Sequence, residues 1–340
     1  MKALIYDAPG VFAVREVPTP APTGTQVLIR VRACGVCKTD VHIHHGQFFA
    51  AFPLIPGHEF AGEVAAVGDA VTRTAVGDRV TADNERQCGH CYFCLRGEAL
   101  FCENVYAQGV NAPGGFAEYV LVEEGQVYPL AAEISFLEGA LIEPTACAVH
   151  GMDVIAARTG DEVLQFGAGP TGLILAQLLH HRGAAPLVVA DLSPVKLTQA
   201  ARWAGAETVL VRPDDPSAHA QFIHERCPRG YDIAIDATGV SRVAAGLPEY
   251  AKYGAKIVYY GVAPEEDRVQ VSPYEVFRKE LKILGSFSQA HTFARATALV
   301  NTGVVRVHEM VTHTFPLEAW ADALKMVTGT GDHIKLVMTP

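Results

Sequence analysis

The sequence lacks long apolar stretches and any excess of basic residues. No run of about 18 apolar residues is present that would span a bilayer, and the first ten residues contain charge, glycine and proline where a secretory signal needs an apolar core. Acidic residues outnumber basic ones by 37 to 27 without a basic cluster, so neither a nucleic acid nor a membrane is expected as a partner. Repeats and low-complexity segments are also lacking. We therefore expect a soluble, cytoplasmic protein that acts on small molecules.

Cysteine is present, but its spacing does not suit a disulfide framework. Four of the eight cysteines fall within 15 residues, namely Cys88, Cys91, Cys94 and Cys102. Four thiolates at this spacing form a closed tetrahedral site, which is typical of structural zinc. An iron–sulfur cluster is the alternative, but its fourth cysteine is expected sooner and followed by proline, whereas Cys102 precedes Glu103. Metal-bound thiolates in a reducing compartment are therefore expected.

A second candidate metal site lies between Cys37 and Glu59. Cys37, His58 and Glu59 offer a thiolate, an imidazole and a carboxylate, and a fourth position stays open, as in a catalytic zinc site. Thr39 and His42 follow Cys37 closely and place a proton-exchanging hydroxyl and imidazole beside a Lewis acid. A buried thiol and a core histidine are the alternative interpretation of Cys37 and His58, and the combination with Glu59 disfavours it.

Glu143 is a further carboxylate, in an apolar window before Pro144. It is either a surface acid at a helix start or a metal ligand, because a buried carboxylate needs a partner. Zinc with Cys37 and one glutamate is neutral, whereas zinc with both Glu59 and Glu143 carries one net negative charge. We therefore expect one glutamate to bind directly and the other through water. Asp40 is expected either to hold the His58 ring or to cap a turn.

The segment from Phe166 to Gly172 has the spacing G-x-G-x-x-G between an apolar run and a helical window. Such glycines permit a tight turn and a close approach of a pyrophosphate to a helix N-terminus. The candidate binding residues here are Gly167, Gly169, Pro170, Thr171 and Gly172. A glycine turn that only packs a helix on a strand is the alternative.

Asp191 follows nineteen residues after Gly172, at the end of the next apolar run, where a carboxylate binds the cofactor ribose. Its charge would repel a 2′-phosphate, so NAD is favoured over NADP. Thr238 and Gly261 follow two later apolar runs and are expected to lie near the nicotinamide. Lys38 is a candidate phosphate partner, with a solvent-facing loop lysine as the alternative.

The 340 residues, 49% of them hydrophobic, suffice for about two domains. Short strands separated by turns predict a small barrel-like β domain, with strands expected at 2–6, 11–17, 26–33, 62–67, 78–82 and 117–122. Apolar runs then alternate with helical windows such as 171–182, which predicts a doubly wound α/β domain with strands at 163–166, 186–190, 208–211, 231–235, 256–260 and 282–285. Helical windows at 293–302 and 317–328 and a strand at 334–338 are expected to rejoin the first domain.

These motifs resemble the zinc-dependent medium-chain alcohol and polyol dehydrogenases over essentially the whole chain. The resemblance is carried by Cys37 to His42, Gly57-His58-Glu59, the four-cysteine lobe at 88–102, Glu143-Pro144 and Gly167 to Gly172. Glutamate at position 143, where other alcohol dehydrogenases carry a second cysteine, is similar to the sorbitol and threonine dehydrogenase branch. Sorbitol-type members carry an Arg-Tyr pair where this chain has Ser286-Phe287, so a different substrate pocket is expected.

The resemblance implies a doubly wound parallel (Rossmann) sheet, residues 151–285, inserted in a GroES-like β-barrel catalytic domain, residues 1–150 and 286–340. It implies NAD and two zinc ions per chain, one catalytic and one structural. The implied enzyme is an NAD-dependent zinc alcohol or polyol dehydrogenase (EC 1.1.1.-) that interconverts a secondary alcohol and its ketone. The proton would leave through Thr39, a cofactor ribose hydroxyl and His42. A homodimer or homotetramer through 281–287 is implied as well.

Three alternatives remain open. L-threonine 3-dehydrogenase would need groups for an ammonium and a carboxylate, and none can be assigned from the sequence. A simple secondary-alcohol dehydrogenase is the second alternative. A cofactor-binding sensor or structural protein that lost activity should lack Cys37, Thr39 or His58, yet all three are present.

Overall fold

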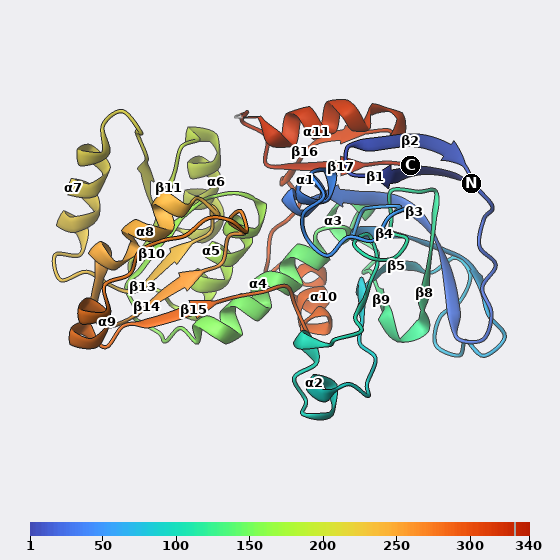
Figure 1. The fold of residues 1–340 in the computed structure, drawn as a ribbon, viewed down its shortest axis with the longest axis horizontal. Helices are drawn as coiled ribbons and strands as arrows, with labels where there is room; N and C mark the ends of the chain where they lie inside the picture. The colour runs from blue at the N-terminus through green and yellow to red at the C-terminus, as the bar shows by residue number, and fades with distance from the viewer. Residues whose placement is uncertain (330) are drawn as a thin grey trace. The chain divides into compact units, whose positions relative to one another are not determined.

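Strands with alternating burial build the first of two compact units into which the chain divides, residues 1–146 with 290–340. The computed structural model describes residues 1–329 and 331–340. The main sheet of this unit has the order β16-β17-β3-β4-β5-β9, with β8 also paired to β3, and β1 and β2 form a separate hairpin (Figure 1). Their bounds are β1 (Lys2–Ala8), β2 (Val11–Glu16), β3 (Gln26–Val36), β4 (Glu59–Val67), β5 (Arg79–Ala82), β8 (Tyr119–Glu123), β9 (Val127–Pro129), β16 (Val311–Phe315) and β17 (Lys335–Met338).

The strands of this unit enclose one apolar core. Side chains from β1, β3, β4 and β5 meet there with Phe116 and with Trp320 at the start of α11 (Trp320–Thr328). Other short helices of this unit are α1 (Lys38–His44), α3 (Phe136–Gly139), α10 (Phe293–Asn301) and η3 (Leu317–Ala319). Because β17 pairs with β3, residues at the two ends of the sequence share this core.

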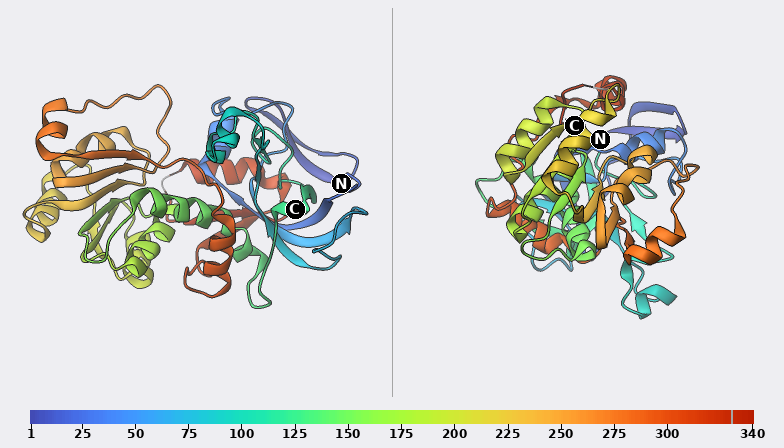
Figure 2. Two further views of the ribbon diagram at one scale, coloured as in Figure 1. Left: turned by 90° about the horizontal axis from the view of Figure 1, so that it is seen from below. Right: turned by 90° about the vertical axis from the view of Figure 1, so that its left-hand side faces the viewer.

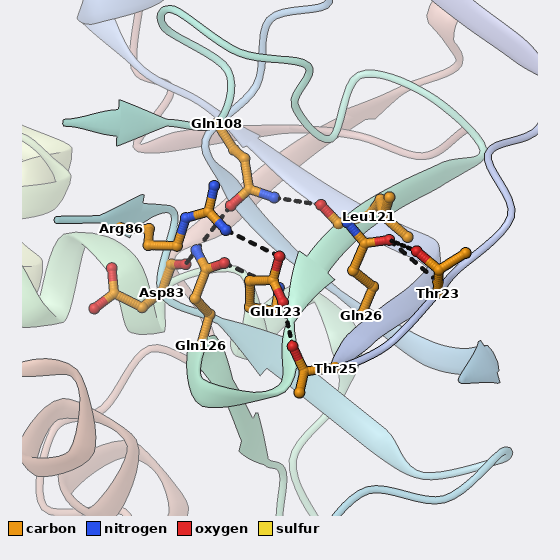
Figure 3. A network of polar contacts seen from close by, with 9 residues as sticks. All are labelled: Thr23, Thr25, Gln26, Asp83, Arg86, Gln108, Leu121, Glu123 and Gln126. Carbon is orange, nitrogen blue, oxygen red and sulfur yellow. Dashed lines mark hydrogen bonds and ion pairs between the residues drawn. The ribbon is translucent and has the colours of Figure 1, made fainter. Parts of the chain in front are cut away.

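A lobe extends from the barrel on the short ribbon β6 (Glu85–Arg86) and β7 (Tyr106–Ala107) (Figure 1). It contains α2 (Tyr92–Leu95) and η1 (Ala99–Phe101). Figure 3 shows how its base is tied to the barrel: Arg86 donates to Glu123 at 2.9 Å, and Gln108 donates to the carbonyl of Leu121 at 2.7 Å. Gln126, in η2 (Glu124–Gln126), donates to Gln108 at 3.0 Å. These bonds fix where the lobe leaves the sheet.

The second unit, residues 147–289, is built on a six-stranded parallel sheet. Its strands are β10 (Val163–Phe166), β11 (Leu187–Asp191), β12 (Glu207–Leu210), β13 (Tyr231–Asp236), β14 (Ala251–Tyr259) and β15 (Lys282–Gly285). The order β12-β11-β10-β13-β14-β15 is that of a doubly wound sheet, in which all strands are parallel and the order in which the chain adds them reverses between β10 and β13. A ligand therefore has its natural position at the carboxyl ends of these two strands.

Helices lie on both faces of this sheet (Figure 2). They are α5 (Pro170–Arg182), α6 (Pro194–Ala204), α7 (Pro216–Arg226), α8 (Ser241–Tyr250) and α9 (Pro273–Lys279), and α4 (Ile142–Ile155) leads into the unit. Proline opens α5, α6 and α9, where its fixed φ suits a first turn and no amide hydrogen is needed. Among the described residues, no helix combines the length and apolarity required to span a bilayer.

The predicted fold class, a doubly wound parallel sheet combined with a barrel-like β domain, is confirmed. The bounds of some elements differ from the expectation. β3 continues to Val36 and not 33 because β17 pairs with its end, Leu336 opposite Val36. β4 begins at Glu59 and not at 62, so the proposed ligand lies within the sheet. The strands β6, β7, β9 and β16 were not predicted; β6, β7 and β9 have only two or three residues, too few to show a pattern, and β16, Val311–Phe315, has no continuous apolar run.

Candidate active site

Cys37 lies where β3 ends and α1 begins. It is the N-cap of α1, with extended backbone angles. Its N–H donates to the Asp40 carboxylate at 2.8 Å, which closes a capping box and fixes the direction of the sulfur. Asp40 is 1% exposed. Burial raises the pKa of Asp40 to about 6, against the opposing effects of His58 and the Cys37 N–H.

Gly57 brings His58 and Glu59 to the same place from the start of β4. Its φ of +89° is one that other residues rarely adopt, and a Cβ there would lie 2.4 Å from the Phe116 ring. Glycine is therefore the residue that lets the chain turn directly before His58. Because Glu59 pairs with Gly35, near the end of β3, the two halves of the candidate site are held by one pair of strands.

Cys37, His58 and Glu59 have one donor atom each within 4.8 Å of one another. His58 and Glu59 are buried, 6% and 1% exposed. Burial alone would lower the pKa of His58, but hydrogen bonding to Cys37 and the negative charges of Asp40, Cys37 and Glu143 raise it well above its ordinary value. The pocket thus favours a cation. Sulfur, nitrogen and oxygen donors in a buried anionic pocket fit zinc.

Lys335, on the last strand β17, is a component of this site that the sequence interpretation missed. It is 3% exposed, and its Nζ donates to Glu59 Oε1 at 2.6 Å. Burial alone would lower the pKa of Lys335, but the charges of Glu59, Cys37 and Glu143 raise it. Lys335 is therefore protonated beside the three anions. A lysine in a predicted strand suggests a solvent-facing side chain, so no signal in the sequence marked it.

Glu143 and Asp40 were the open points of the sequence interpretation. Glu143 lies at the start of α4 and is 7% exposed. Its charge raises the pKa of His58 and of Lys335. It is not one of the three residues whose donor atoms form the group described above. Asp40 Oδ1 lies 3.8 Å from His58 Nδ1, longer than a hydrogen bond. The cap on Cys37 is the contact that Asp40 makes.

Thr39 and His42 extend from the same short helix as Asp40. The Thr39 hydroxyl lies 3.6 Å from Cys37 Sγ, so it is beside the group of three donor atoms. His42 Nδ1 lies 2.7 Å from Gln47 Oε1. Lys38 begins the helix and is exposed. Thr39 and His42, which are three residues apart in the sequence, are thus presented by successive turns of the short helix α1.

The four cysteines of the lobe come together as their spacing suggested. Cys88, Cys91, Cys94 and Cys102 have sulfur atoms within 4.8 Å of one another, and Cys91 and Cys102 are 4.0 Å apart. Two thiolates bound tetrahedrally at 2.3 Å to one ion would be about 3.8 Å apart. The backbone N–H of His90, together with other donors, lowers the pKa of Cys88 to about 6. All eight cysteines, which lie among the described residues, are free thiols.

The glycine-rich loop runs from β10 into α5. Gly167, with φ +104°, has no space for a side chain, since a Cβ would lie 2.8 Å from the Ala237 backbone. Gly169 is the N-cap of α5, Pro170 its first residue, and Thr171 and Gly172 follow in the first turn. Free N–H groups at this terminus suit a pyrophosphate. The loop lies at the carboxyl end of β10, beside the reversal point of the sheet.

Gln165 supports this loop through hydrogen bonds to its backbone, and the sequence interpretation did not identify this residue either. It is 0% exposed, and its Nε2 donates to the carbonyls of Gly167 and Gly172 at 2.8 and 2.9 Å. Asp191, the last residue of β11, accepts from Ala168 N at 2.6 Å and from Ser193 N at 2.8 Å. Glutamine within an apolar run gives no indication of which groups it contacts.

Thr238 follows β13, which is next to β10, and Gly261 follows β14, which is next to β13. Thr238 donates to Asp236 from both its N–H and its hydroxyl, at 2.8 and 2.5 Å. Gly261 N donates to the Asp236 carbonyl at 2.8 Å, and a Cβ on Gly261 would lie 2.2 Å from Gly239 N. The two turns therefore touch, close to the reversal point where a dinucleotide is expected.

Comparison with known proteins covers both units. Residues 23–132 match the alcohol dehydrogenase GroES-like domain, and residues 170–302 match the zinc-binding dehydrogenase domain. Over 95% of the chain and 93% of the relative, the sequence is 41% identical to D-arabinitol dehydrogenase 1 of Uromyces fabae. It is 35% identical to D-altritol 5-dehydrogenase of Agrobacterium fabrum (strain C58) over 93% of each.

Among solved structures, a protein of Sinorhizobium meliloti 1021 assigned as a zinc-binding dehydrogenase, crystallised with NADP, is similar throughout. It has a TM-score of 0.93 and 33% sequence identity, and the match covers 100% of this chain and 99% of that one.

Proposed function

The chain belongs to the zinc-dependent medium-chain alcohol and polyol dehydrogenases, and on that premise we propose that it interconverts a secondary alcohol of a polyol or sugar alcohol and the ketone, with NAD as hydride acceptor. Oxidation removes a hydride from the carbinol carbon and a proton from its oxygen. The observation that carries the proposal is the group of Cys37, His58 and Glu59, with donor atoms within 4.8 Å. Polyols are proposed because the relatives described above are named for arabinitol and altritol.

We propose that Cys37, His58 and Glu59 hold the catalytic zinc, with Glu143 beside them as a ligand through water. A zinc ion bound there supplies a Lewis acid for the substrate oxygen. Lys335 changes the charge balance. Cys37, Glu59 and Glu143 carry three negative charges, Lys335 returns one positive charge, and a divalent ion balances the remaining two. Lys335 therefore offsets the negative charge that Glu143 adds to the site. The lobe cysteines would hold a second, structural zinc.

The chain's own groups for the proton are Thr39 and His42. Thr39 accepts the alcohol proton at Oγ1 and gives up its own hydroxyl proton along the path to His42; this oxygen lies 3.6 Å from Cys37 Sγ and thus close to the substrate oxygen. His42, five residues after Cys37, releases the proton to solvent. Both side chains come from α1, so their separation is set by one rigid helix.

NAD is the proposed cofactor in preference to NADP. Asp191 ends β11 with a carboxylate that two backbone N–H groups already hold in place. Its remaining lone pairs suit a ribose hydroxyl, and its charge disfavours a 2′-phosphate. We expect a higher kcat/KM with NAD than with NADP. The reaction is placed in the cytoplasm, where thiolates stay reduced and available to metals.

A second copy of the chain is the proposed protein partner. β15 is an edge strand of the parallel sheet, with Ile283 40% exposed, and Phe277 in the preceding helix is 80% exposed. An open edge with apolar side chains is a surface on which a strand of another chain can pair. Two-fold pairing of β15 would give a dimer, or a tetramer with a second interface. Sedimentation analysis of Ile283→Glu against the wild type tests this.

The experiment for the function measures NADH formation with polyols, sugars, L-threonine and simple secondary alcohols. A polyol is expected to give the highest kcat/KM. Preference for threonine would select L-threonine 3-dehydrogenase, and no turnover of any alcohol would favour a sensor protein. Thr39→Ala is expected to lower kcat by about 10²- to 10⁴-fold with unchanged zinc content. A wild-type rate in that variant would contradict the role of Thr39.

A further inference from the structure

His42 is held by a side chain that neither the sequence motifs nor the proposed function includes. Its Nδ1 lies 2.7 Å from Gln47 Oε1. The backbone N–H of Gln47 also donates to the carbonyl of His42 at 2.9 Å, so the segment following α1 folds back onto the same residue. Both side chains are partly buried. Gln47 is thus fixed relative to His42 by two hydrogen bonds, one from the backbone and one to the ring.

The contact determines where the imidazole carries its proton. An amide oxygen only accepts hydrogen bonds, so His42 Nδ1 must be the N–H donor. In the neutral ring, Nε2 then has the free lone pair. A base that is to receive a proton needs that lone pair on the nitrogen that faces the donor, and a fixed ring orientation.

His44, two residues further along α1, is held in the opposite way. Trp320 Nε1 can only donate, and it donates to the Tyr6 hydroxyl at 2.7 Å. The Tyr6 hydrogen is then available for His44 Nδ1, 2.9 Å away, so Nδ1 of His44 accepts and its proton is on Nε2. Burial, together with the nearby His45, lowers the pKa of His44. Two histidines of one helix therefore have opposite tautomers, and only His42 has Nε2 free to accept.

We propose that Gln47 is a positioning residue for His42: its amide oxygen fixes the ring and selects the tautomer that can take up the substrate-derived proton at Nε2. The inference rests on the proposed function, in which His42 passes that proton to solvent. Gln47 itself does not contact the substrate. Its role resembles that of the carboxylate or carbonyl that orients a histidine base in other enzymes.

The test compares Gln47→Leu and Gln47→Asn, which remove the acceptor or withdraw it from reach, with Gln47→Glu, which keeps it. The readout is the first-turnover rate of NADH formation by stopped flow, together with KM, the NADH dissociation constant and zinc content. Gln47→Leu and Gln47→Asn are expected to lower the rate about 10-fold with KM, NADH binding and zinc unchanged, and Gln47→Glu to keep the wild-type rate. Tyr6→Phe, which removes the partner of His44 instead, is the matched control and is expected to keep the rate.

Two further variants separate the inference from its premise. His42→Ala and Thr39→Ala should both be slow if the proposed function is right. If His42→Ala is slow but Gln47→Leu and Gln47→Asn react at the wild-type rate, the role of Gln47 is overturned and the proton path through His42 stands. A wild-type rate in His42→Ala would overturn the proton path and this inference with it. Loss of zinc or of NADH binding in the Gln47 variants would show that Gln47 has a merely structural role. The same conclusion would follow if Gln47→Glu were slowed as much as Gln47→Leu. Either result would overturn the inference that Gln47 positions His42.

Discussion

Gly35 leaves the space in which the buried pair Glu59 and Lys335 can form. A Cβ on Gly35 would lie 1.9 Å from Glu59 Oε2 and 2.9 Å from Lys335 Cε. Both groups are almost completely buried, so neither can move out to solvent without losing its partner. A buried pair of this kind is costly when one charge is left alone. The hydrogen of Gly35, in place of the methyl group of alanine, thus determines whether the Glu59 carboxylate, the proposed zinc ligand, keeps its position.

Gly35→Ala is therefore expected to remove the catalytic zinc and leave the structural one. Zinc per chain, measured by mass spectrometry of the purified protein, should fall from about two to about one, with loss of alcohol oxidation. The matched control is Gly246→Ala in α8, where a Cβ meets nothing within 4 Å. That variant should keep zinc and activity and be slightly more stable, by about 0.5–1 kcal/mol. Full zinc content in Gly35→Ala would contradict the assignment of Glu59 as a ligand.

The sequence alone pointed to those candidate site residues whose spacing forms a recognisable motif. Cys37, His58 and Glu59 lie at the ends of two strands that pair with each other, and the four lobe cysteines lie within 15 residues, so short motifs in the sequence marked both groups. Lys335, Gln165 and Gln47 were not identified. Lys335 meets Glu59 across 276 residues, and the two glutamines act through contacts with backbone and ring atoms that have no sequence pattern. Their roles follow only from packing.

At the level of secondary-structure elements, hydrogen bonds from two side chains, Gln165 and Asp191, hold the loop between β10 and α5. Gln165 bonds the carbonyls of Gly167 and Gly172, and Asp191 bonds the N–H of Ala168. Alternation along β10 places Gln165 on the face that α5 covers. These bonds fix the shape of the loop without a ligand, which would reduce the ordering cost of the proposed cofactor binding.

Gln165→Met is expected to weaken NADH binding about 10-fold, because two carbonyls lose their buried donor and the loop relaxes. The dissociation constant from NADH fluorescence is the measurement. Gln177→Met is the control, since Gln177 is equally buried but donates within α5, to the Leu173 carbonyl at 3.3 Å. Unchanged NADH affinity in Gln165→Met, or an equal loss in both variants, would count against a specific role for Gln165.

Glu124, in η2, ties the segment 72–74 to the barrel. Its Oε1 accepts from the backbone N–H groups of Arg73, Thr72 and Thr74, the last two at 2.9 and 3.1 Å. The Arg73 N–H foremost, then the others, lower the pKa of Glu124 below its ordinary value of 4.5. A group with a lowered folded-state pKa stabilises the fold above its unfolded pKa, and this stabilisation is lost as pH falls through the folded one.

Glu124→Gln should therefore lower the melting temperature at pH 7. The difference from the wild type should shrink as the pH falls below 4.5, because the wild-type carboxyl then becomes neutral as well. Melting curves across that pH range give the measurement. Glu266→Gln, at an exposed position, is the control and should follow the wild type. A constant difference at all pH values would mean that charge on Glu124 does not contribute.

Elements with a long regular pattern were predictable, and their ends were less so. The window 171–182 became α5 with one residue added, and 282–285 is β15 as expected. The window 317–328 divides into η3 and α11. Strand ends such as that of β3 depend on a partner 300 residues away, Leu336 opposite Val36. No local pattern contains that partner.

At the scale of the molecule, the order of the parallel sheet explains where its binding residues come from. Gly167, Asp191, Thr238 and Gly261 all follow or end strands of that sheet, at the carboxyl edge, although almost a hundred residues separate the first from the last. Alternation of apolar runs and helical windows was enough to predict this topology. The β unit was harder to predict, because its strands pair across large distances in the sequence.

The central claim is that Cys37 and His58 bind a zinc ion without which no alcohol is oxidised. Zinc content and alcohol oxidation of Cys37→Ala, measured on the same preparation as the wild type, test it most directly. The account predicts that zinc falls from about two ions per chain to about one and that oxidation is lost, while NADH binding is kept. A Cys37→Ala protein that retains both zinc ions and oxidises its alcohol at the wild-type rate would contradict it.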